Sequence, residues 1–223
     1  MIAPTPDNIT GWVLAGGQAQ RMGGVDKGLQ LFQGQALALL AAKRLETQVH
    51  VVKLNANRHL SDYARWGYDV HADSVSGFAG PLAGMLTGLQ YCDTEWLLCV
   101  PCDSPFFPLD LAYRLGMAVD AEQSEIATAW APELNAKGET VCRPQPVFCL
   151  LHRSLRQSLL DFLQQGGRKI DAWTKQHANA RMDFTLPHDA RHAFANANTW
   201  QELKDLEGSA VFVETESSSS KIV

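Results

Sequence analysis

The residues with the clearest chemical potential lie in a glycine-rich stretch near the amino terminus, residues 14–28, which reads LAGGQAQRMGGVDKG. Two basic side chains, Arg21 and Lys27, stand among its glycines. Glycine lets backbone N–H groups approach an anion closely, and Lys or Arg neutralises the anion's charge. An apolar run over residues 9–15 precedes the stretch and predicts a buried strand. A strand that opens into such a loop indicates a phosphate-binding site.

The spacing of this loop argues against two common phosphate-binding motifs. A Walker A motif needs G-x-x-x-x-G-K followed by Ser or Thr, whereas Lys27 follows Val25 and Asp26 and precedes Gly28. The dinucleotide fingerprint G-x-G-x-x-G does not fit either, because the first two glycines are adjacent. A flexible surface turn is the remaining bland interpretation, and two basic side chains bracketed by glycines disfavour it.

A second candidate is Asp103, which follows the most strand-like run of the chain, residues 95–101. A carboxylate is a hard oxygen ligand, and Mg²⁺ is typically bound by one or two carboxylates together with phosphate oxygens and water. The alternative is a turn residue, for which Asp103-Ser104-Pro105 is equally suited. Spacing alone leaves the two interpretations even. Asp103 follows a strand that we expect to lie beside the strand before the glycine-rich loop. This position favours the interpretation of Asp103 as a metal ligand.

The elements that must position these residues alternate along the first half of the chain. Apolar runs predict strands, and apolar residues at helical spacing predict the helices between them. The expected strands are residues 9–15, 49–54, 68–71 and 95–101, and the expected helices are residues 36–48, 60–65, 82–89 and 109–119. This order predicts a three-layer α/β/α Rossmann-like fold with a mainly parallel central sheet. Ligands of such sheets bind beyond the carboxyl ends of the strands, where the loop, Asn55, Asp73 and Asp103 would meet.

The second half is less regular, and we find no linker that would separate two domains. Strands are expected at residues 125–130 and 145–151, with a polar, turn-rich segment between them. Helices are expected at residues 155–163, after Arg168-Lys169, and from a capping box at Thr199 to about residue 208. We therefore predict a single domain over residues 1–208 and a flexible tail over residues 209–223.

Composition limits the partners and the compartment. The 223 residues contain 19 Lys and Arg against 24 Asp and Glu, a net charge of −5, which argues against nucleic acid or an anionic membrane as the main partner. The start shows no leader pattern, and no apolar run approaches the roughly 18 residues of a membrane span, so we expect a cytoplasmic protein. Cys99 and Cys102 form a C-x-x-C without a second pair, and we interpret them as structural thiols rather than metal ligands.

The loop closely resembles the signature of nucleotidyltransferases that charge sugar phosphates and cofactors with a nucleotide, and its Arg-Met-Gly and Asp-Lys elements resemble the molybdenum cofactor guanylyltransferases in particular. Further matches extend over nearly the whole chain: residues 55–58, 80–85, 101–105 and 194–199. The resemblance implies an enzyme that joins GMP from GTP to the terminal phosphate of molybdenum-bearing molybdopterin. It also implies pyrophosphate release and Mg²⁺ as cofactor.

The resemblance further implies residue roles, which stay expectations at this point. Arg21, Lys27 and Asp103 would be catalytic, and Asp103 would bind the metal. The nucleotide would contact Leu14, Ala15, Gly16, Gly17, Lys27, Asn55, Asp73 and Asp103. The pterin side would involve Gly84, Arg168, Asn196 and Asn198, although the segment of Arg168 departs from the family pattern and the two asparagines could equally serve an edge strand and a helix cap.

Alternative functions of two kinds stay open from the sequence. A sister enzyme could use CTP on the same pterin or act on a sugar phosphate. A nucleotide-binding adaptor that has lost catalysis would be expected to lack Arg21, Lys27 or Asp103, and all three are present. Transient contacts with other molybdenum cofactor proteins are plausible because such a product is labile, but no motif indicates them.

Overall fold

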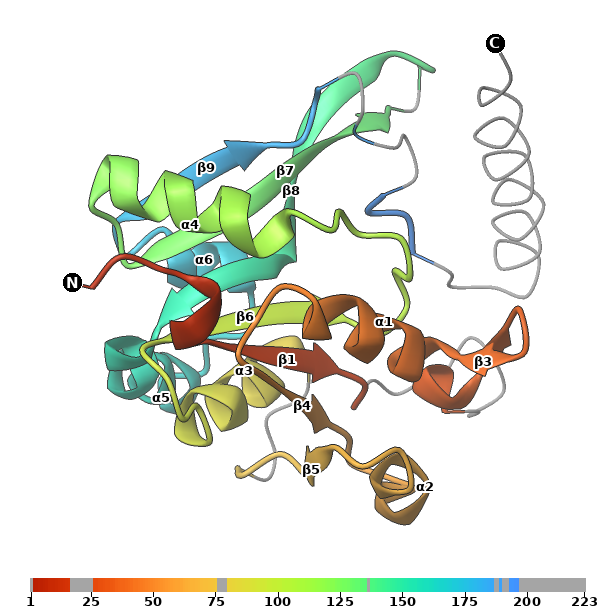
Figure 1. The fold of residues 1–223 in the computed structure, drawn as a ribbon. Coiled ribbons are helices and arrows are strands. Elements are labelled where there is room, and N and C mark those ends of the chain that lie inside the picture. The colour runs from red at the N-terminus through yellow and green to blue at the C-terminus, as the bar shows by residue number, and fades with distance from the viewer. Residues whose placement is uncertain are drawn as a thin grey trace, which may run out of the picture.

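The computed structural model describes residues 2–16, 26–75, 80–135, 137–186, 189 and 193–196. Seven strands of this described part form one sheet (Figure 1). Their order across the sheet is β5 (Asp69–His71), β4 (Val51–Asn55), β1 (Ile9–Leu14), β6 (Trp96–Pro101), β8 (Thr140–His152), β7 (Ile126–Leu134) and β9 (Asn179–Asp183). Only β8 runs antiparallel to its neighbours among these strands. The predicted mainly parallel sheet is therefore confirmed.

Helices cover both faces of the sheet, as Figure 1 shows. One face carries α1 (Leu37–Glu46), α2 (Leu60–Ala64) and α4 (Leu111–Glu122), and the other carries α3 (Pro81–Gln90), α5 (Arg156–Gln164) and α6 (Ile170–Thr174). Successive strand residues point to opposite faces, so that Trp12 packs with the α3 layer and Val13 with the α1 layer. The three-layer α/β/α architecture follows from two apolar layers, one on each side of the sheet.

The apolar patterns that predicted these elements lie where the fold requires them. Leu82, Met85, Leu86 and Leu89 of α3 are all buried against the sheet. Trp12, Trp96 and Trp173 are fully buried and belong to the core. Cys99 and Cys102 are buried as well, as expected of structural thiols. None of the described helices has the length and apolarity that a membrane span would need.

Two predictions of secondary structure were incomplete. The segment between the strands at 125–130 and 145–151 is mostly strand, with a turn only between Leu134 and Thr140, because β7 and β8 stay paired out to these two residues. The pairing has an irregularity between Thr128 and Ala129. Backbone pairing holds this arm together while its polar side chains face solvent. Strand β9 was missed because only Ala180 and Met182 of its five residues pack on the core, which leaves a weak apolar alternation.

The alternation of apolar and polar residues over 28–34 predicts a short strand that ends in a turn, and this prediction is wrong in its first half. Residues Lys27–Leu29 form a short 3₁₀ helix, η3, and only Leu31–Phe32 (β2) and Gln35–Ala36 (β3) pair as a small hairpin. The capping of η3 by Asp26 explains the difference, because its side chain bonds the backbone N–H of Gly28 at 3.1 Å. The expected helix over 199–208 and the tail lie outside the described residues.

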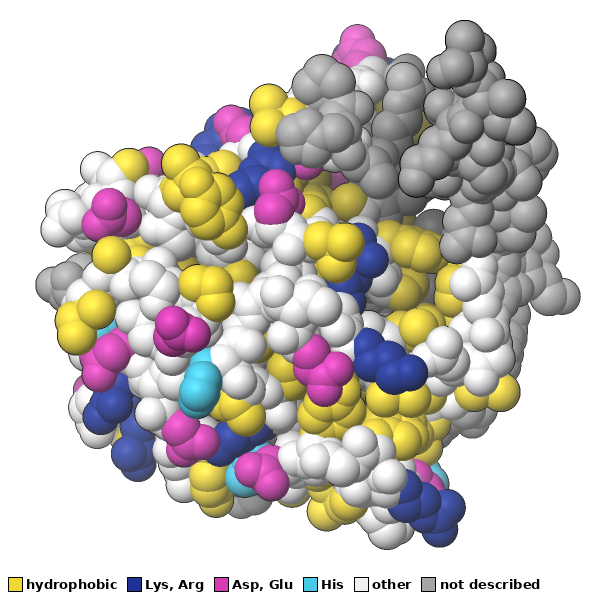
Figure 2. Space-filling model, viewed as in Figure 1, with side chains coloured by type: hydrophobic (Ala, Val, Ile, Leu, Met, Phe, Trp, Pro, Cys, Tyr) yellow, Lys and Arg dark blue, Asp and Glu magenta, His cyan; other side chains and the backbone are white. Residues whose placement is uncertain are grey.

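Charged side chains of both signs are interspersed over the face that carries α1 and α4 (Figure 2). Leu109, just before α4, and Tyr113 and Met117 of α4 have exposed apolar side chains. The described part of this face thus offers no broad basic area to a polyanion, in line with the net charge of −5.

A buried ion pair fastens the segment that follows β9. Arg114 Nη1 of α4 lies 2.6 Å from Asp189 Oδ1, and the two side chains are only 9% and 5% exposed. Arg114 Nη2 also donates to the carbonyl of Asp183 at 2.6 Å, and its guanidinium lies over the Phe184 ring at 3.9 Å. This one arginine therefore ties the chain beyond β9 to α4.

We expect Arg114→Ala to lower the free energy of unfolding by about 3–5 kcal/mol, because it leaves the Asp189 carboxylate buried without its cation. Urea denaturation measures this loss. Arg156→Ala, at an exposed position of α5, is the matched control and should change stability by no more than about 0.5 kcal/mol. A loss below about 1 kcal/mol in Arg114→Ala would contradict the anchoring role.

Candidate active site

Several of the predicted site residues gather where the central parallel strands end. Leu14, the last residue of β1, is in register with Asn55 of β4 on one side and with Pro101 of β6 on the other. Ala15 N donates to the Asn55 carbonyl at 2.8 Å, and Cys102 N donates to the Leu14 carbonyl at 3.1 Å. The glycine-rich loop, the Asn55 segment and the Asp103 turn therefore start from the same edge, as the topology predicted.

The closest contact between charged groups at this edge joins the loop to the β6 turn. Lys27 Nζ lies 2.5 Å from Asp103 Oδ2, although the two residues are 76 positions apart. Both side chains are partly open, at 17% and 16% exposure, so that a small ligand can still reach them. An ammonium and a carboxylate held this close form a charge-assisted hydrogen bond. Two of the three predicted catalytic residues are thus brought together.

A second cluster surrounds Asn55, which is buried. Asn55 Nδ2 donates to the His71 carbonyl at 3.1 Å and to Asp73 Oδ1 at 3.0 Å. Asn57 completes the cluster, because its Nδ2 donates to Asp73 Oδ2 at 2.8 Å and its Oδ1 accepts from Asp73 N at 2.8 Å. The predicted pair Asn55 and Asp73 is therefore a directly bonded unit. Asn57 was missed, although its spacing of two from Asn55 in the same strand-end segment was a usable signal.

Two glycines pack against this cluster. A Cβ atom on Gly84 would lie 2.3 Å from Asn55 Oδ1 and 2.4 Å from Leu14 Cδ2. A Cβ atom on Gly16 would lie 2.8 Å from Asn57 Nδ2. Both glycines are needed for the close approach of α3 and the loop to the asparagines. Gly84, predicted on the pterin side, thus lies among the residues predicted for the nucleotide.

The described part of the motif at residues 194–199 also lies at the edge of the sheet that holds Asp103. Ser104 Oγ donates to Asn196 Oδ1 at 2.5 Å, directly after Asp103 in the chain. Phe194 packs edge-on against Phe148 and Phe184, with ring centroids 4.9 and 5.1 Å apart, and so fixes the segment. Asn196 is thereby brought beside the Asp103 turn. Ser104 was not singled out from the sequence, where an Asp-Ser-Pro turn explains the serine without a partner.

Arg168 lies apart from Asn196. It follows α5, and its Nη1 donates to the carbonyls of Leu163 and Gly167 at 3.1 and 2.6 Å. Helix α5 packs in the α3 layer, whereas Phe194, two residues before Asn196, packs in the α1 layer. Gly17, Arg21 and Asn198 lie outside the described residues.

Burial sets the protonation of two side chains beside the site. Burial and the nearby Asp103 carboxylate raise the pKa of the Cys102 thiol, which therefore stays a neutral thiol rather than a nucleophile or metal ligand. His71 is stacked between Trp12 and Tyr91, with ring centroids 5.7 and 4.1 Å away. Burial and the Lys53 ammonium lower the pKa of His71, so its imidazole is neutral at pH 7.

The donor set around Asp103 fits a cation that shares its ligands with a substrate. Among the described residues no group of three or more His, Cys, Asp and Glu side chains could hold a metal ion. A single carboxylate is nevertheless enough for Mg²⁺, which keeps several waters and takes phosphate oxygens from its substrate. Asp103 suits this mode because its side chain is partly open and stands at the ligand-binding edge.

Comparisons with known proteins agree with this geometry. The chain matches the profile of the MobA-like NTP transferase domain over residues 11–180. A molybdenum cofactor guanylyltransferase of Acidovorax ebreus is 56% identical over 202 residues, which cover 90% of this chain and 96% of the relative. A molybdenum cofactor guanylyltransferase of Ralstonia nicotianae is 50% identical over 203 residues, covering 91% and 97%.

Solved structures share the fold at low sequence identity. The molybdopterin-guanine dinucleotide biosynthesis protein A of Archaeoglobus fulgidus superposes with a TM-score of 0.72 at 17% identity, over 91% of this chain and 98% of that protein. The 4-diphosphocytidyl-2C-methyl-D-erythritol synthase of Anaerococcus prevotii gives a TM-score of 0.67 at 10% identity, over 92% and 99%. The family profile and the close relatives place the sequence more narrowly than this shared fold does: the chain belongs to the MobA-like NTP transferase family.

Proposed function

We propose that this chain transfers GMP from GTP to the terminal phosphate of molybdenum-bearing molybdopterin, with release of pyrophosphate and with Mg²⁺ as cofactor. The observation that carries the proposal is the 2.5 Å contact between Lys27 and Asp103 at the edge where the glycine-rich loop begins. It brings a phosphate-binding cation and a hard carboxylate to one point. The named activity of relatives that are 56% and 50% identical supports the same nucleotide and acceptor.

The reaction brings two anions together. An oxygen of the pterin phosphate attacks the α-phosphorus of GTP, and the bond from this phosphorus to the oxygen bridging to the β-phosphate breaks. Charge neutralisation and in-line alignment are therefore the main tasks of the protein. Lys27 would contact the α-phosphate and offset the charge that builds on the leaving pyrophosphate. The corresponding role of Arg21 on the β- and γ-phosphates stays a prediction.

The Lys27–Asp103 pair holds both groups ready before nucleotide arrives. Lysine has three N–H donors, so Lys27 can bind a phosphate oxygen while it keeps one bond to Asp103. Asp103 has a second carboxylate oxygen with which it would hold Mg²⁺. The ion, when bound, would neutralise part of the phosphate charge.

The Asn55 cluster would orient the nucleoside. An amide offers both a donor and an acceptor, and a carboxylate accepts from ribose hydroxyls or a guanine N–H. Because Asp73 receives N–H groups from both Asn55 and Asn57, its carboxylate is fixed before the ligand binds. The acceptor would lie toward Asn196, held by Ser104 next to Asp103. The pterin contacts of Asn198 and Arg168 stay predictions. So do later contacts with other molybdenum cofactor proteins and a cytoplasmic location.

The CTP-dependent and sugar-phosphate alternatives are separated by one experiment. Turnover is measured with GTP and with CTP, each with molybdopterin or a sugar phosphate as acceptor, by following pyrophosphate release. We expect turnover with GTP and molybdopterin and less than about a hundredth of it in the other combinations. A faster reaction with CTP or with a sugar phosphate would contradict the proposed substrates. Binding of GTP without any pyrophosphate would favour the adaptor.

We expect Asp103→Ala to lower pyrophosphate release about a hundredfold or more, because the metal-binding carboxylate and the partner of Lys27 are both lost. The assay contains GTP, molybdopterin and Mg²⁺, and thermal melting checks that the variant is folded. Asp120→Ala, at an exposed position of α4, is the control and should keep normal turnover. Near-normal turnover in Asp103→Ala would exclude the assigned role.

Gly84→Ala should weaken GTP binding about tenfold, because the new Cβ displaces the Asn55 amide from its place beside Leu14. Isothermal titration calorimetry measures the affinity. Gly116→Ala is the matched control in another helix, where the nearest atom, Pro4 Cβ, lies 3.2 Å away and nucleotide binding should not change. Unchanged GTP affinity in Gly84→Ala, together with weaker pterin binding, would instead place Gly84 on the acceptor side.

Ser104→Ala should raise the KM for molybdopterin about five- to tenfold and leave the KM for GTP unchanged, since it releases Asn196 from the Asp103 turn. Ser124→Ala is the control, because Ser124 is an equally buried serine whose Oγ donates at 2.9 Å to the carbonyl of Ile126, at the opposite edge of the sheet. A change in the KM for GTP alone would contradict the acceptor-side role of Asn196.

A further inference from the structure

One buried tyrosine contacts the segment that carries Lys27. Tyr63 of α2 is fully buried, and its hydroxyl donates to Asp26 Oδ1 at 2.6 Å. The Trp66 ring packs edge-on against it at a centroid distance of 5.2 Å. Burial and the bond to the Asp26 carboxylate raise the pKa of the Tyr63 hydroxyl, which is therefore a protonated donor at pH 7.

Asp26 also forms hydrogen bonds with the residues that follow Lys27 in the η3 turn. The same Oδ1 atom accepts from Gly28 N at 3.1 Å, and Asp26 is the N-cap of η3. The Asp26 carbonyl accepts from Leu29 N at 3.3 Å and from Gln30 Nε2 at 3.3 Å. With Asp26 only 6% exposed, little water competes for these bonds. The backbone turn from which the Lys27 side chain extends is therefore fixed by the Asp26 carboxylate. Tyr63 in turn holds that carboxylate in place.

Gly28 shows how closely the turn and the tyrosine are fitted. A Cβ atom on Gly28 would lie 2.3 Å from the Tyr63 hydroxyl oxygen, 3.1 Å from Ala15 Cβ and 3.2 Å from Ala38 Cβ. No larger residue fits between β1, α1 and α2 at this point. The backbone beside Lys27 thus rests directly on the tyrosine hydroxyl.

We propose that Tyr63 is a positioning residue for the transfer reaction, which acts through Asp26 to hold the η3 turn so that the Lys27 ammonium meets the nucleotide phosphate. This inference rests on the phosphate-binding role proposed above for Lys27. A lysine side chain has several rotatable bonds, so its reach depends on a fixed starting point. Tyr63 touches neither substrate nor metal in this arrangement and is not itself catalytic.

The position of α2 in the chain gives this contact a second consequence. Helix α2 begins at Leu60, three residues after Asn57, whose amide binds Asp73. The element that holds the Lys27 turn is therefore covalently continuous with the segment that would orient the nucleoside. Tyr63 and the two asparagines of the Asn55 cluster thus belong to one continuous stretch of chain, residues 55–63.

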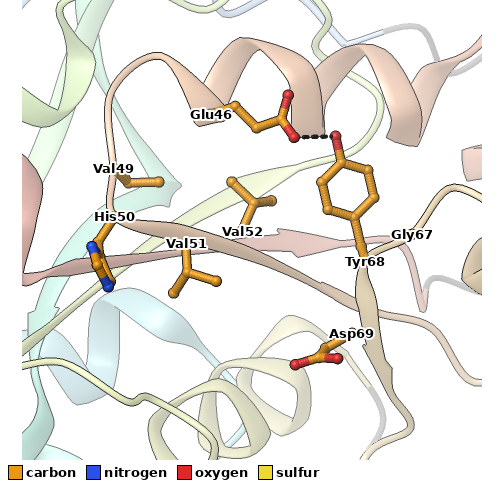
Figure 3. A pocket seen from close by; sticks show the side chains of 8 residues that line it. All are labelled: Glu46, Val49, His50, Val51, Val52, Gly67, Tyr68 and Asp69. Atoms are coloured by element: carbon orange, nitrogen blue, oxygen red, sulfur yellow. Dashed lines mark hydrogen bonds between the residues drawn. The ribbon is translucent and has the colours of Figure 1, made fainter.

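The test substitutes Tyr63→Phe and compares it with Tyr68→Phe. Tyr68 is a matched control, because its hydroxyl also donates to a carboxylate, Glu46 Oε1, at 2.8 Å. It lines a hollow of about 360 Å³ between α1 and the amino-terminal ends of β4 and β5, at the sheet edge opposite the site (Figure 3). The kcat, the KM for GTP and the melting temperature are measured for both variants and for Lys27→Ala, with molybdopterin in excess.

We expect Tyr63→Phe to lower kcat roughly tenfold while the KM for GTP changes less than about twofold, at a temperature where the variant is folded. Tyr68→Phe should leave both constants unchanged. A kcat of Tyr63→Phe within about twofold of the wild type, or a loss that only follows the unfolded fraction, would overturn the positioning role.

The Lys27→Ala arm separates this inference from the proposed function. If Lys27→Ala loses turnover and Tyr63→Phe keeps it, only the positioning role fails. If Lys27→Ala itself turns over normally, the role of Lys27 fails first. Should Tyr63→Phe not fold, Asp26→Ala and Asp26→Asn decide: Asn keeps an acceptor for Tyr63 and Gly28, so Asp26→Asn should retain more of kcat than Asp26→Ala. Equal kcat values in the two variants would contradict the inference.

Discussion

Opposite charges of Lys27 and Asp103 meet at 2.5 Å where the two central parallel strands end, and the rest of the site is arranged around this contact. One partner leaves the sheet through the glycine-rich loop after β1, and the other leaves through the turn after β6. Leu14 and Pro101 are paired in adjacent parallel strands, and this pairing sets the distance between the points at which the two segments leave the sheet. A site for two phosphates needs both an ammonium and a hard carboxylate within reach of one point, and this pairing provides them.

Close packing around small residues keeps the other groups in place. Gly84 lets α3 approach Asn55, and Gly28 lets the η3 turn rest on Tyr63, at positions where a methyl group would already collide. The polar side chains between them bond to one another before any ligand is present. Such preorganisation lowers the ordering cost of binding and favours a fixed geometry of the phosphates. The same bonds satisfy polar groups that would otherwise be buried without partners.

Much of this arrangement could be predicted from the sequence, because its causes are local. Alternation of apolar strands and helices gave the parallel sheet, and the strand-end positions of Asn55, Asp73 and Asp103 placed them at one edge. Tyr63, Ser104 and Arg114 could not be found in this way, since each acts on a residue at least 37 positions away. The residues around Tyr63 indicate only an apolar helix, those around Ser104 only a turn, and those around Arg114 only another helix. None of these local patterns indicates a distant partner. Strand β9 was missed for a related reason, because pairing with β7 rather than its own pattern makes it a strand.

The fate of the individual GTP phosphates tests the central claim most directly. GTP labelled at the α-phosphate and GTP labelled at the γ-phosphate are incubated separately with the protein, Mg²⁺ and molybdenum-bearing molybdopterin, and the products are separated. The account predicts that the α label appears on the pterin product and the γ label in pyrophosphate, in equal amounts. An α label that stays in free GMP or GDP, or a γ label released as inorganic phosphate, would contradict it.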